Sequence, residues 1–175
     1  MFKTERCSLS TFQESDCEDV SKLFTNRQVR KYLGGIRDAD SLKETLEDML
    51  DPHSDSYFWV VKGKSTKEFI GLISLDLHHN GIDYEVSYQL LPKCWGKGYA
   101  VETVSVIIDF ALKNLKLPAV VAETQSANIS SCRLLEKVGM ELERKVFRYE
   151  AEQSLYVIRC LKSEGIQGLS NTFIE

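Results

Sequence analysis

The six residues Trp95-Gly96-Lys97-Gly98-Tyr99-Ala100 decide how this chain is interpreted. They lie between residues 84–91, whose alternating polarity predicts a strand, and a long amphipathic helix predicted from about residue 100. The first amides of a helix lack partners within it, the helix dipole adds partial positive charge there, and glycine lets the backbone approach a ligand closely. We therefore predict an anion site, best suited to a pyrophosphate. The alternative is a tight strand-to-helix turn that uses its glycines for geometry alone.

The spacing of this loop excludes two common phosphate-binding motifs. The dinucleotide fingerprint needs a third glycine where Val101 stands, and a P-loop needs serine or threonine where Gly98 stands. No carboxylate cluster next to the loop suggests a metal site. The sequence therefore favours a pyrophosphate ligand bound without a metal.

The rest of the chain alternates between strand and helix patterns. Aromatic and β-branched runs predict strands at residues 7–12, 56–61, 69–77, 84–91, 119–124, 145–150 and 155–161. Capping motifs predict helices that start at Ser15-x-x-Glu18 and Ser41-x-x-Glu44, and two more helices are expected from about Ala100 and over Asn128 to Val138. The order β-α-α-β-β-β-α-β-α-β-β indicates a mixed α+β domain.

The strand before the glycine loop is entered through a turn. Asn80-Gly81 predicts a type I′ turn, because both turn positions need positive φ, and His78 and His79 before it are expected to be exposed. The strand that follows alternates cleanly, so that one of its faces is unusually polar. The polar face holds Glu85, Ser87 and Gln89, and the opposite face holds Tyr84, Val86, Tyr88 and Leu90.

Composition limits the class of protein. The chain has 175 residues, 43% of them hydrophobic, which suits one domain with a sizeable core, and its net charge of −4 argues against a general nucleic-acid binder. No apolar run approaches the roughly 20 residues of a membrane span, and the first residues do not resemble a signal peptide. The five scattered cysteines indicate free thiols in a reducing cytoplasm. We expect a single domain over residues 1–162, a tail at 163–175, and no membrane or nucleic-acid partner.

Three segments together resemble a known family: Tyr88-Gln89-Leu90-Leu91-Pro92, Trp95 to Ala100, and Asn128 to Met140. They look like the acetyl-CoA-binding core of the GNAT N-acetyltransferases, especially the RimJ/RimL-like branch, and they occur in the family's order. The resemblance implies a mixed, mostly antiparallel sheet flanked by helices, in which a splayed strand pair forms the acetyl-CoA slot. It also implies a cytoplasmic enzyme that uses acetyl-CoA and no metal, with a homodimer as an open option.

The resemblance assigns roles to residues of this chain. Tyr88, Gln89 and Leu90 would pair with the pantetheine arm like a neighbouring strand, Asn128 would lie beside that arm, and Ser131 near the thioester sulfur. Asn128 is equally suited to a purely structural role as a helix N-cap. Backbone amides of seven residues would hold the CoA pyrophosphate: Trp95, Gly96, Lys97, Gly98, Tyr99, Ala100 and Val101.

The implied chemistry is direct acetyl transfer to an amine, which must first lose a proton. Glu85 is the candidate base, and the alternative is a solvated strand residue. Many relatives carry a tyrosine seven residues after Asn128 as the acid for the leaving thiolate, and here that position is Leu135. Either Ser131 donates a hydrogen bond to the sulfur, or the thiolate leaves unaided, since a thiol with a pKa of about 8.5 is a tolerable leaving group. Cys132 is a less suitable nucleophile, and we expect it to be buried.

The acceptor is the least defined partner. Residues 26–35 and Trp59 are expected to contact it, but these side chains do not distinguish a protein N-terminus from a small-molecule amine. Two other functions fit the same motifs: a non-catalytic CoA-binding or sensor domain of the same fold, and a nucleotide-binding protein that uses the glycine loop.

Overall fold

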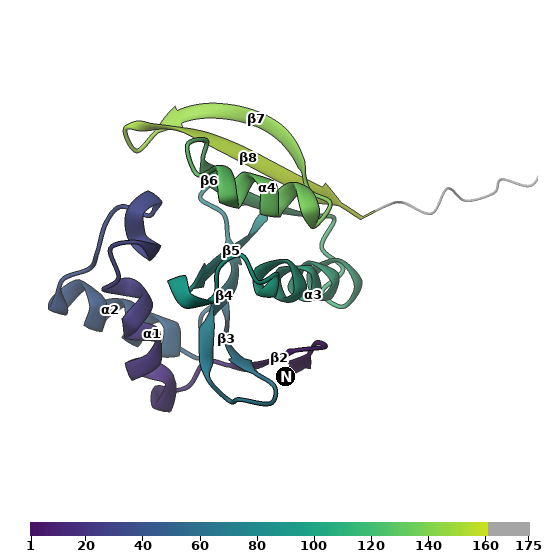
Figure 1. The fold of residues 1–175 in the computed structure, drawn as a ribbon. Helices are drawn as coiled ribbons and strands as arrows, with labels where there is room; N and C mark the ends of the chain where they lie inside the picture. Colours follow the sequence, from purple (N-terminus) through teal and green to yellow (C-terminus); the bar gives the residue numbers. More distant parts are fainter. Residues whose placement is uncertain (161–175) are drawn as a thin grey trace, which may run out of the picture.

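The computed structural model describes residues 1–160, which form one sheet of eight strands in the order β1-β2-β3-β4-β5-β6-β8-β7 (Figure 1). Every neighbouring pair is antiparallel except β5 and β6, which are parallel. The predicted α+β class with a mostly antiparallel sheet is confirmed. The predicted end of the last strand at residue 161, the domain end at 162 and the tail at 163–175 lie outside the described residues.

The elements follow the predicted order, with a short first strand added. The strands are β1 Phe2–Lys3, β2 Cys7–Thr11, β3 Tyr57–Gly63, β4 Phe69–Leu77, β5 Tyr84–Leu90, β6 Ala119–Gln125, β7 Glu141–Arg148 and β8 Ala151–Arg159. The α-helices are α1 Cys17–Phe24, α2 Ala39–Leu50, α3 Tyr99–Lys113 and α4 Ile129–Lys137. Short 3-10 helices occur at Glu14–Asp16, Val29–Tyr32 and Pro92–Cys94. Within residues 1–160, every helix is too short or too polar to span a bilayer.

Both predicted serine caps are wrong. The first α-helix begins at Cys17 after a 3-10 turn, in which the carboxylate of Asp16 accepts the backbone N–H of Gln13 at 3.3 Å. In α2 the cap is Asp38, whose carboxylate accepts the backbone N–H of Ser41 at 2.9 Å. The first turn of α1 thus has no side-chain cap, whereas in α2 the aspartate three residues before Ser41 takes the capping role, for which aspartate is as suitable as serine.

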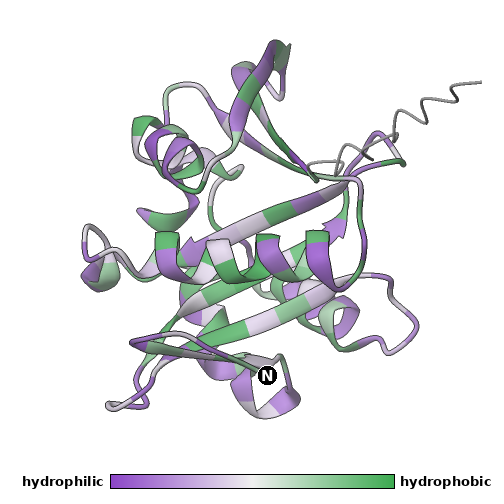
Figure 2. Ribbon diagram, turned by 90° about the vertical axis from the view of Figure 1, so that its right-hand side faces the viewer, coloured by the Kyte–Doolittle hydropathy of each residue, from purple (hydrophilic) through white to green (hydrophobic). Residues whose placement is uncertain are grey.

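Helices cover both faces of the sheet. On one face α3 and α4 pack over β3 to β6, and the core there includes Ile73, Val86, Val104 and Ile108. On the other face α1 and α2 pack over β2 to β4, around Val20, Leu23, Val60 and Leu72. Figure 2 shows long hydrophobic stretches on the central strands. The apolar cluster under α1 and α2 does not extend to the polar face of β5 and β6.

The parallel pair β5 and β6 is splayed, as predicted. The two strands pair only where Tyr84 and Glu85 meet Val120 and Val121. Beyond that point β6 continues along β8 up to Gln125, whereas β5 stays with β4 up to Leu90. The second half of β5 therefore presents an edge towards the opening between the strands, and α4 follows directly from β6 (Figure 1).

The connection between β4 and β5 is the predicted hairpin, but its turn is not type I′. Only Gly81 has a positive φ, of 70°. Asn80 acts through its side chain instead, because its amide oxygen accepts the backbone N–H groups of Ile82 at 3.0 Å and Asp83 at 3.1 Å. An asparagine that satisfies the following amides in this way stabilises a turn without a left-handed backbone.

Candidate active site

The glycine loop ends where α3 begins. Gly96 and Gly98 have φ values of 69° and 81°, and Gly98 is the residue before the first turn, with no side chain to cap that turn. The indole N–H of Trp95 donates to the carbonyl of Leu90 at 2.8 Å, which fixes the start of the loop on β5. The glycines are thus required by backbone geometry, and the first amides of α3 have no side-chain cap to compete with an anion.

Arg6 contacts this loop, which the sequence did not indicate. Its guanidinium donates to the carbonyl of Lys97 at 2.8 Å, forms an ion pair with Glu102 at 2.8 Å, and lies 4.7 Å from the centre of the Tyr99 ring. A Cβ added at Gly98 would lie 3.2 Å from this guanidinium. Arg6 therefore holds the loop in place and adds a cation beside it.

The edge of β5 and the start of α4 face each other across the splay. The Oδ1 atom of Asn128 accepts the backbone N–H of Ser131 at 3.3 Å, so its N-cap role is confirmed, and its role towards pantetheine stays a prediction. The phenol oxygen of Tyr88 lies 2.6 Å from the Oγ atom of Ser131. Burial raises the pKa of Tyr88 to about 12, and the hydrogen bond with Ser131 offsets part of this shift. One pair of hydroxyls thus joins the second half of β5 to the first turn of α4.

Two other residues of α4 differ in burial. Leu135 is only 1% exposed and lies in the main core. Cys132 is half-buried and packs against that core, rather than being fully buried as expected. The leucine at position 135 therefore offers no proton donor to the slot.

Glu85 is largely withdrawn from solvent. Its side chain is 18% exposed, and its carboxylate accepts the backbone N–H of Glu123 at 3.1 Å. Burial raises its pKa from 4.5 to about 7, while that hydrogen bond and the charge of His78 lower it in part. Asp76 lies directly opposite on β4, and burial raises the pKa of that carboxyl as well. Glu85 is thus not a solvated strand residue, and near neutral pH it exists in both protonation states.

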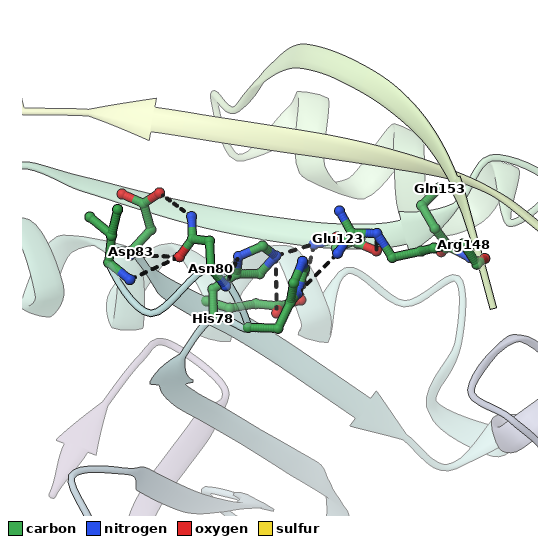
Figure 3. Close-up of polar contacts among 9 residues, drawn as sticks. His78, Asn80, Asp83, Glu123, Arg148 and Gln153 are labelled. Carbon is green, nitrogen blue, oxygen red and sulfur yellow. Dashed lines mark hydrogen bonds and ion pairs between the residues drawn. The ribbon is translucent and has the colours of Figure 1, made fainter.

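His78 lies between the carboxylates of Glu85 and Glu123. The prediction that His78 is exposed is therefore wrong (Figure 3). The residue is 2% exposed, with its Nε2 atom 3.3 Å from Glu123 and 4.0 Å from Glu85. Its backbone N–H donates to the carbonyl of Asp83 at 2.8 Å, which folds the turn back over the strand end. The signal was present in the sequence, because Ser74, Asp76 and His78 continue one polar face with a period of two.

Arg148 completes this cluster from β7 (Figure 3). Its Nε atom is 3.4 Å from Glu123, and its Nη1 atom is 3.2 Å from the Nδ1 atom of His79. The potential ligand atoms of His78, His79 and Glu123 lie within 4.8 Å of one another. The guanidinium already places a cation beside two of them, so we assign no metal to this cluster.

Two expectations about acceptor-binding residues change. Trp59 is buried, with its ring packed near Phe2, Tyr57 and Phe110, so it belongs to the core and cannot contact an acceptor. Arg30 is also buried, and its guanidinium donates to the carbonyls of Leu33 and Gly35. Within residues 26–35 this arginine shapes the loop rather than presenting a free cation.

Comparison with known families agrees with this geometry. Residues 6–141 match the model of the acetyltransferase (GNAT) domain. An uncharacterised N-acetyltransferase of Bacillus subtilis, YoaA, is 26% identical over 156 residues, which cover 85% of this chain and 87% of the relative. The uncharacterised N-acetyltransferase p20 of Bacillus licheniformis is 26% identical over 173 residues, covering 92% of this chain and 96% of p20.

Solved structures share the fold. An acetyltransferase of Agrobacterium tumefaciens superposes with a TM-score of 0.79 at 23% identity, over 91% of this chain and 94% of that one. Spermidine N-acetyltransferase of Vibrio cholerae, in complex with CoA and spermine, gives 0.74 at 19% identity, over 87% and 95%. The ribosomal-protein-S5-alanine acetyltransferase of Vibrio fischeri gives 0.76 at 21% identity, over 90% and 95%. With the family model matching most of its length, this chain belongs to the GNAT family and is an acetyltransferase.

Proposed function

We propose that this protein moves an acetyl group from acetyl-CoA directly to an amine, in the manner of the RimJ/RimL-like branch. The observation that carries the proposal is the splay of β5 from β6, with a glycine loop at the end of β5 and a buried carboxylate at its start. A pantetheine arm has amides that can pair with the free edge of Tyr88 to Leu90. The first amides of α3 suit the pyrophosphate.

Glu85 is the proposed base. The acceptor amine arrives as an ammonium, whose pKa is about 10.4 for a lysine-like amine, and it has no lone pair until a proton is removed. A carboxylate with a pKa of about 7 is partly ionised at neutral pH, and it is a stronger base than an exposed glutamate. The freed amine then attacks the thioester carbon, the C–N bond forms, and the C–S electron pair passes to the sulfur of CoA.

The acceptor is a protein N-terminus or a small-molecule amine. Both classes occur among proteins of this fold, since the Vibrio structures are a spermidine and a ribosomal-protein acetyltransferase. The buried carboxylates Asp76, Glu85 and Glu123 favour a cationic acceptor. The free thiols of Cys7, Cys17, Cys94 and Cys132 support a cytoplasmic location.

A thiol-release assay tests this function. Purified protein is mixed with acetyl-CoA and a panel of polyamines, amino acids and peptides with free N-termini, and the CoA thiol is measured over time. We expect release that depends on one class of amine, and much slower release with Glu85→Gln. Binding of CoA without amine-dependent thiol release across the panel would favour a CoA-binding sensor domain instead. Competition of ATP or NAD against CoA in calorimetry would favour a nucleotide-binding protein.

A further inference from the structure

The hydroxyls of Tyr88 and Ser131 meet at the slot between the splayed strands. Tyr88 lies on the half of β5 beyond its pairing with β6, and Ser131 lies on the first turn of α4. Their oxygen atoms are 2.6 Å apart although 43 residues separate them in the chain. This hydrogen bond therefore bridges the opening in which the proposed function places the thioester.

Ser131 is held from two sides. Its backbone N–H donates to Asn128 at 3.3 Å, and its Oγ atom meets the phenol of Tyr88. Burial raises the pKa of that phenol to about 12, so Tyr88 keeps its proton at any pH near neutral and can act as the donor. When Tyr88 donates to Ser131, the hydroxyl hydrogen of Ser131 is left to point elsewhere.

A hydrogen-bond donor at this place would assist the chemistry. As the C–S bond of the thioester breaks, negative charge develops on sulfur, and a preorganised hydrogen bond to developing charge lowers the barrier. The position that carries a phenol in many relatives is Leu135, which is 1% exposed and packs in the core. Leucine has no hydroxyl, so the donor must be another side chain that reaches the slot.

We propose that Tyr88 is a positioning residue that orients Ser131 as a hydrogen-bond donor to the departing sulfur of CoA. The phenol missing at position 135 is thus replaced by one on β5 that acts through a serine. This inference rests on the proposed function. The electron pair of the C–S bond passes to sulfur, and no proton leaves Ser131 or Tyr88. The released thiolate takes its proton from water.

Product CoA provides a test that needs no acceptor. A site that donates a hydrogen bond to the thiolate lowers the pKa of the bound thiol, so CoA binds more tightly as the pH rises through the thiol's range. Desulfo-CoA has no thiol and serves as the reference ligand. Two other titratable side chains belong to this region: Cys132 on α4, which acts electrostatically on Tyr88, and Tyr156 on β8, which interacts with Cys132 and hydrogen-bonds with Glu136 at 3.3 Å.

The measurement is the dissociation constant of each ligand by calorimetry between about pH 6 and about pH 10. For the wild type we expect the affinity for CoA relative to desulfo-CoA to rise about tenfold across this range, which is a shift of about one unit in the pKa of the thiol. Tyr88→Phe and Ser131→Ala should each lose most of that rise, and the double variant should match Ser131→Ala. Tyr84→Phe, on the same face of the same strand, should keep it.

The outcomes separate the two claims. A packing defect in Tyr88→Phe would weaken both ligands equally and leave their ratio as in the wild type, which would overturn the role of Tyr88. The same pH dependence for CoA and desulfo-CoA in the wild type would overturn donation to the sulfur. If neither CoA nor desulfo-CoA bound at any pH, that result would contradict the proposed function itself, and the inference would fall with it.

Discussion

Replacing Glu85 by glutamine is expected to remove most of the activity and to make the fold more stable at alkaline pH. Burial raises the pKa of Glu85 from 4.5 to about 7. Between these two values the folded protein holds a proton that the unfolded chain has lost, so the free energy of unfolding falls as the pH rises through this window. Above about pH 7 the whole cost of ionising the buried carboxyl is present.

The size of the effect follows from the shift. A change from 4.5 to about 7 corresponds to at most about 3 kcal/mol of unfolding free energy at high pH. Glutamine never ionises, and its amide oxygen can still accept the backbone N–H of Glu123. Glu85→Gln should therefore exceed the wild type in stability by up to about 3 kcal/mol near pH 8, and match it near pH 4. Turnover should fall about 10²–10⁴-fold, because a general base is lost.

Urea unfolding at the two pH values and the thiol-release assay measure both effects. In the wild type, kcat/KM should rise about tenfold per pH unit below about pH 7 and level off above it. Glu141→Gln, an exposed carboxylate on β7, is the matched control and should change neither quantity. A Glu85→Gln protein that is no more stable at pH 8, or that keeps the activity and pH profile of the wild type, would refute the reasoning.

Three further substitutions have defined outcomes. Gly98→Val places a β-branched residue at a φ of 81° beside Arg6, so CoA affinity in calorimetry should fall at least about tenfold; unchanged affinity in a folded protein would remove the loop from the site. His78→Gln removes a charge that lowers the pKa of Glu85, so the midpoint of the pH–rate profile should move to higher pH; a midpoint that stays or falls would contradict the contact. Leu135→Tyr overpacks the core, and urea unfolding should show a loss of about 1–3 kcal/mol without faster turnover, whereas a stable and faster enzyme would place residue 135 in the slot.

The central strands could be predicted from two different signals in the sequence. In β3 and β4 the signal is a run of mostly apolar residues, which are buried on both faces because α3 covers one face and α1 and α2 cover the other, whereas in β5 polar and apolar side chains alternate. By contrast β7 begins at Glu141 rather than at the expected residue 145, and most of its side chains are exposed. A strand that buries few side chains carries little periodic signal, so only pairing with β8 defines its ends.

Turn geometry shows where tertiary pairing overrides local preference. Asn80-Gly81 has the composition of a type I′ turn, yet only Gly81 adopts a positive φ. The positive pair occurs instead at Tyr149 and Glu150, with φ values of 52° and 59°. Arg148 pairs with Ala151, so two residues close this hairpin, and their two positive φ values are those expected of a type I′ turn although neither residue is asparagine or glycine.

The candidate site likewise combines features that the sequence predicts with contacts that only the fold reveals. The glycine loop, the edge of β5 and the cap of α4 are each built from neighbouring residues, so their motifs could be recognised in the chain. Arg6, Glu123 and Arg148 contact the site from distant parts of the chain, and no local pattern indicates such contacts. The replacement at Leu135 was visible in the sequence, but the pairing of Tyr88 with Ser131 required the fold.

Direct transfer is tested most plainly by following the acetyl group itself. The protein is incubated with acetyl-CoA that carries an isotopically labelled acetyl group and with the amine that gives the fastest thiol release, and both acceptor and protein are analysed by mass spectrometry. The label should appear on the acceptor nitrogen in the same amount as the CoA released, with none on the protein. Label retained on Cys132, or CoA released without an acetylated amine, would contradict direct transfer between the two bound substrates.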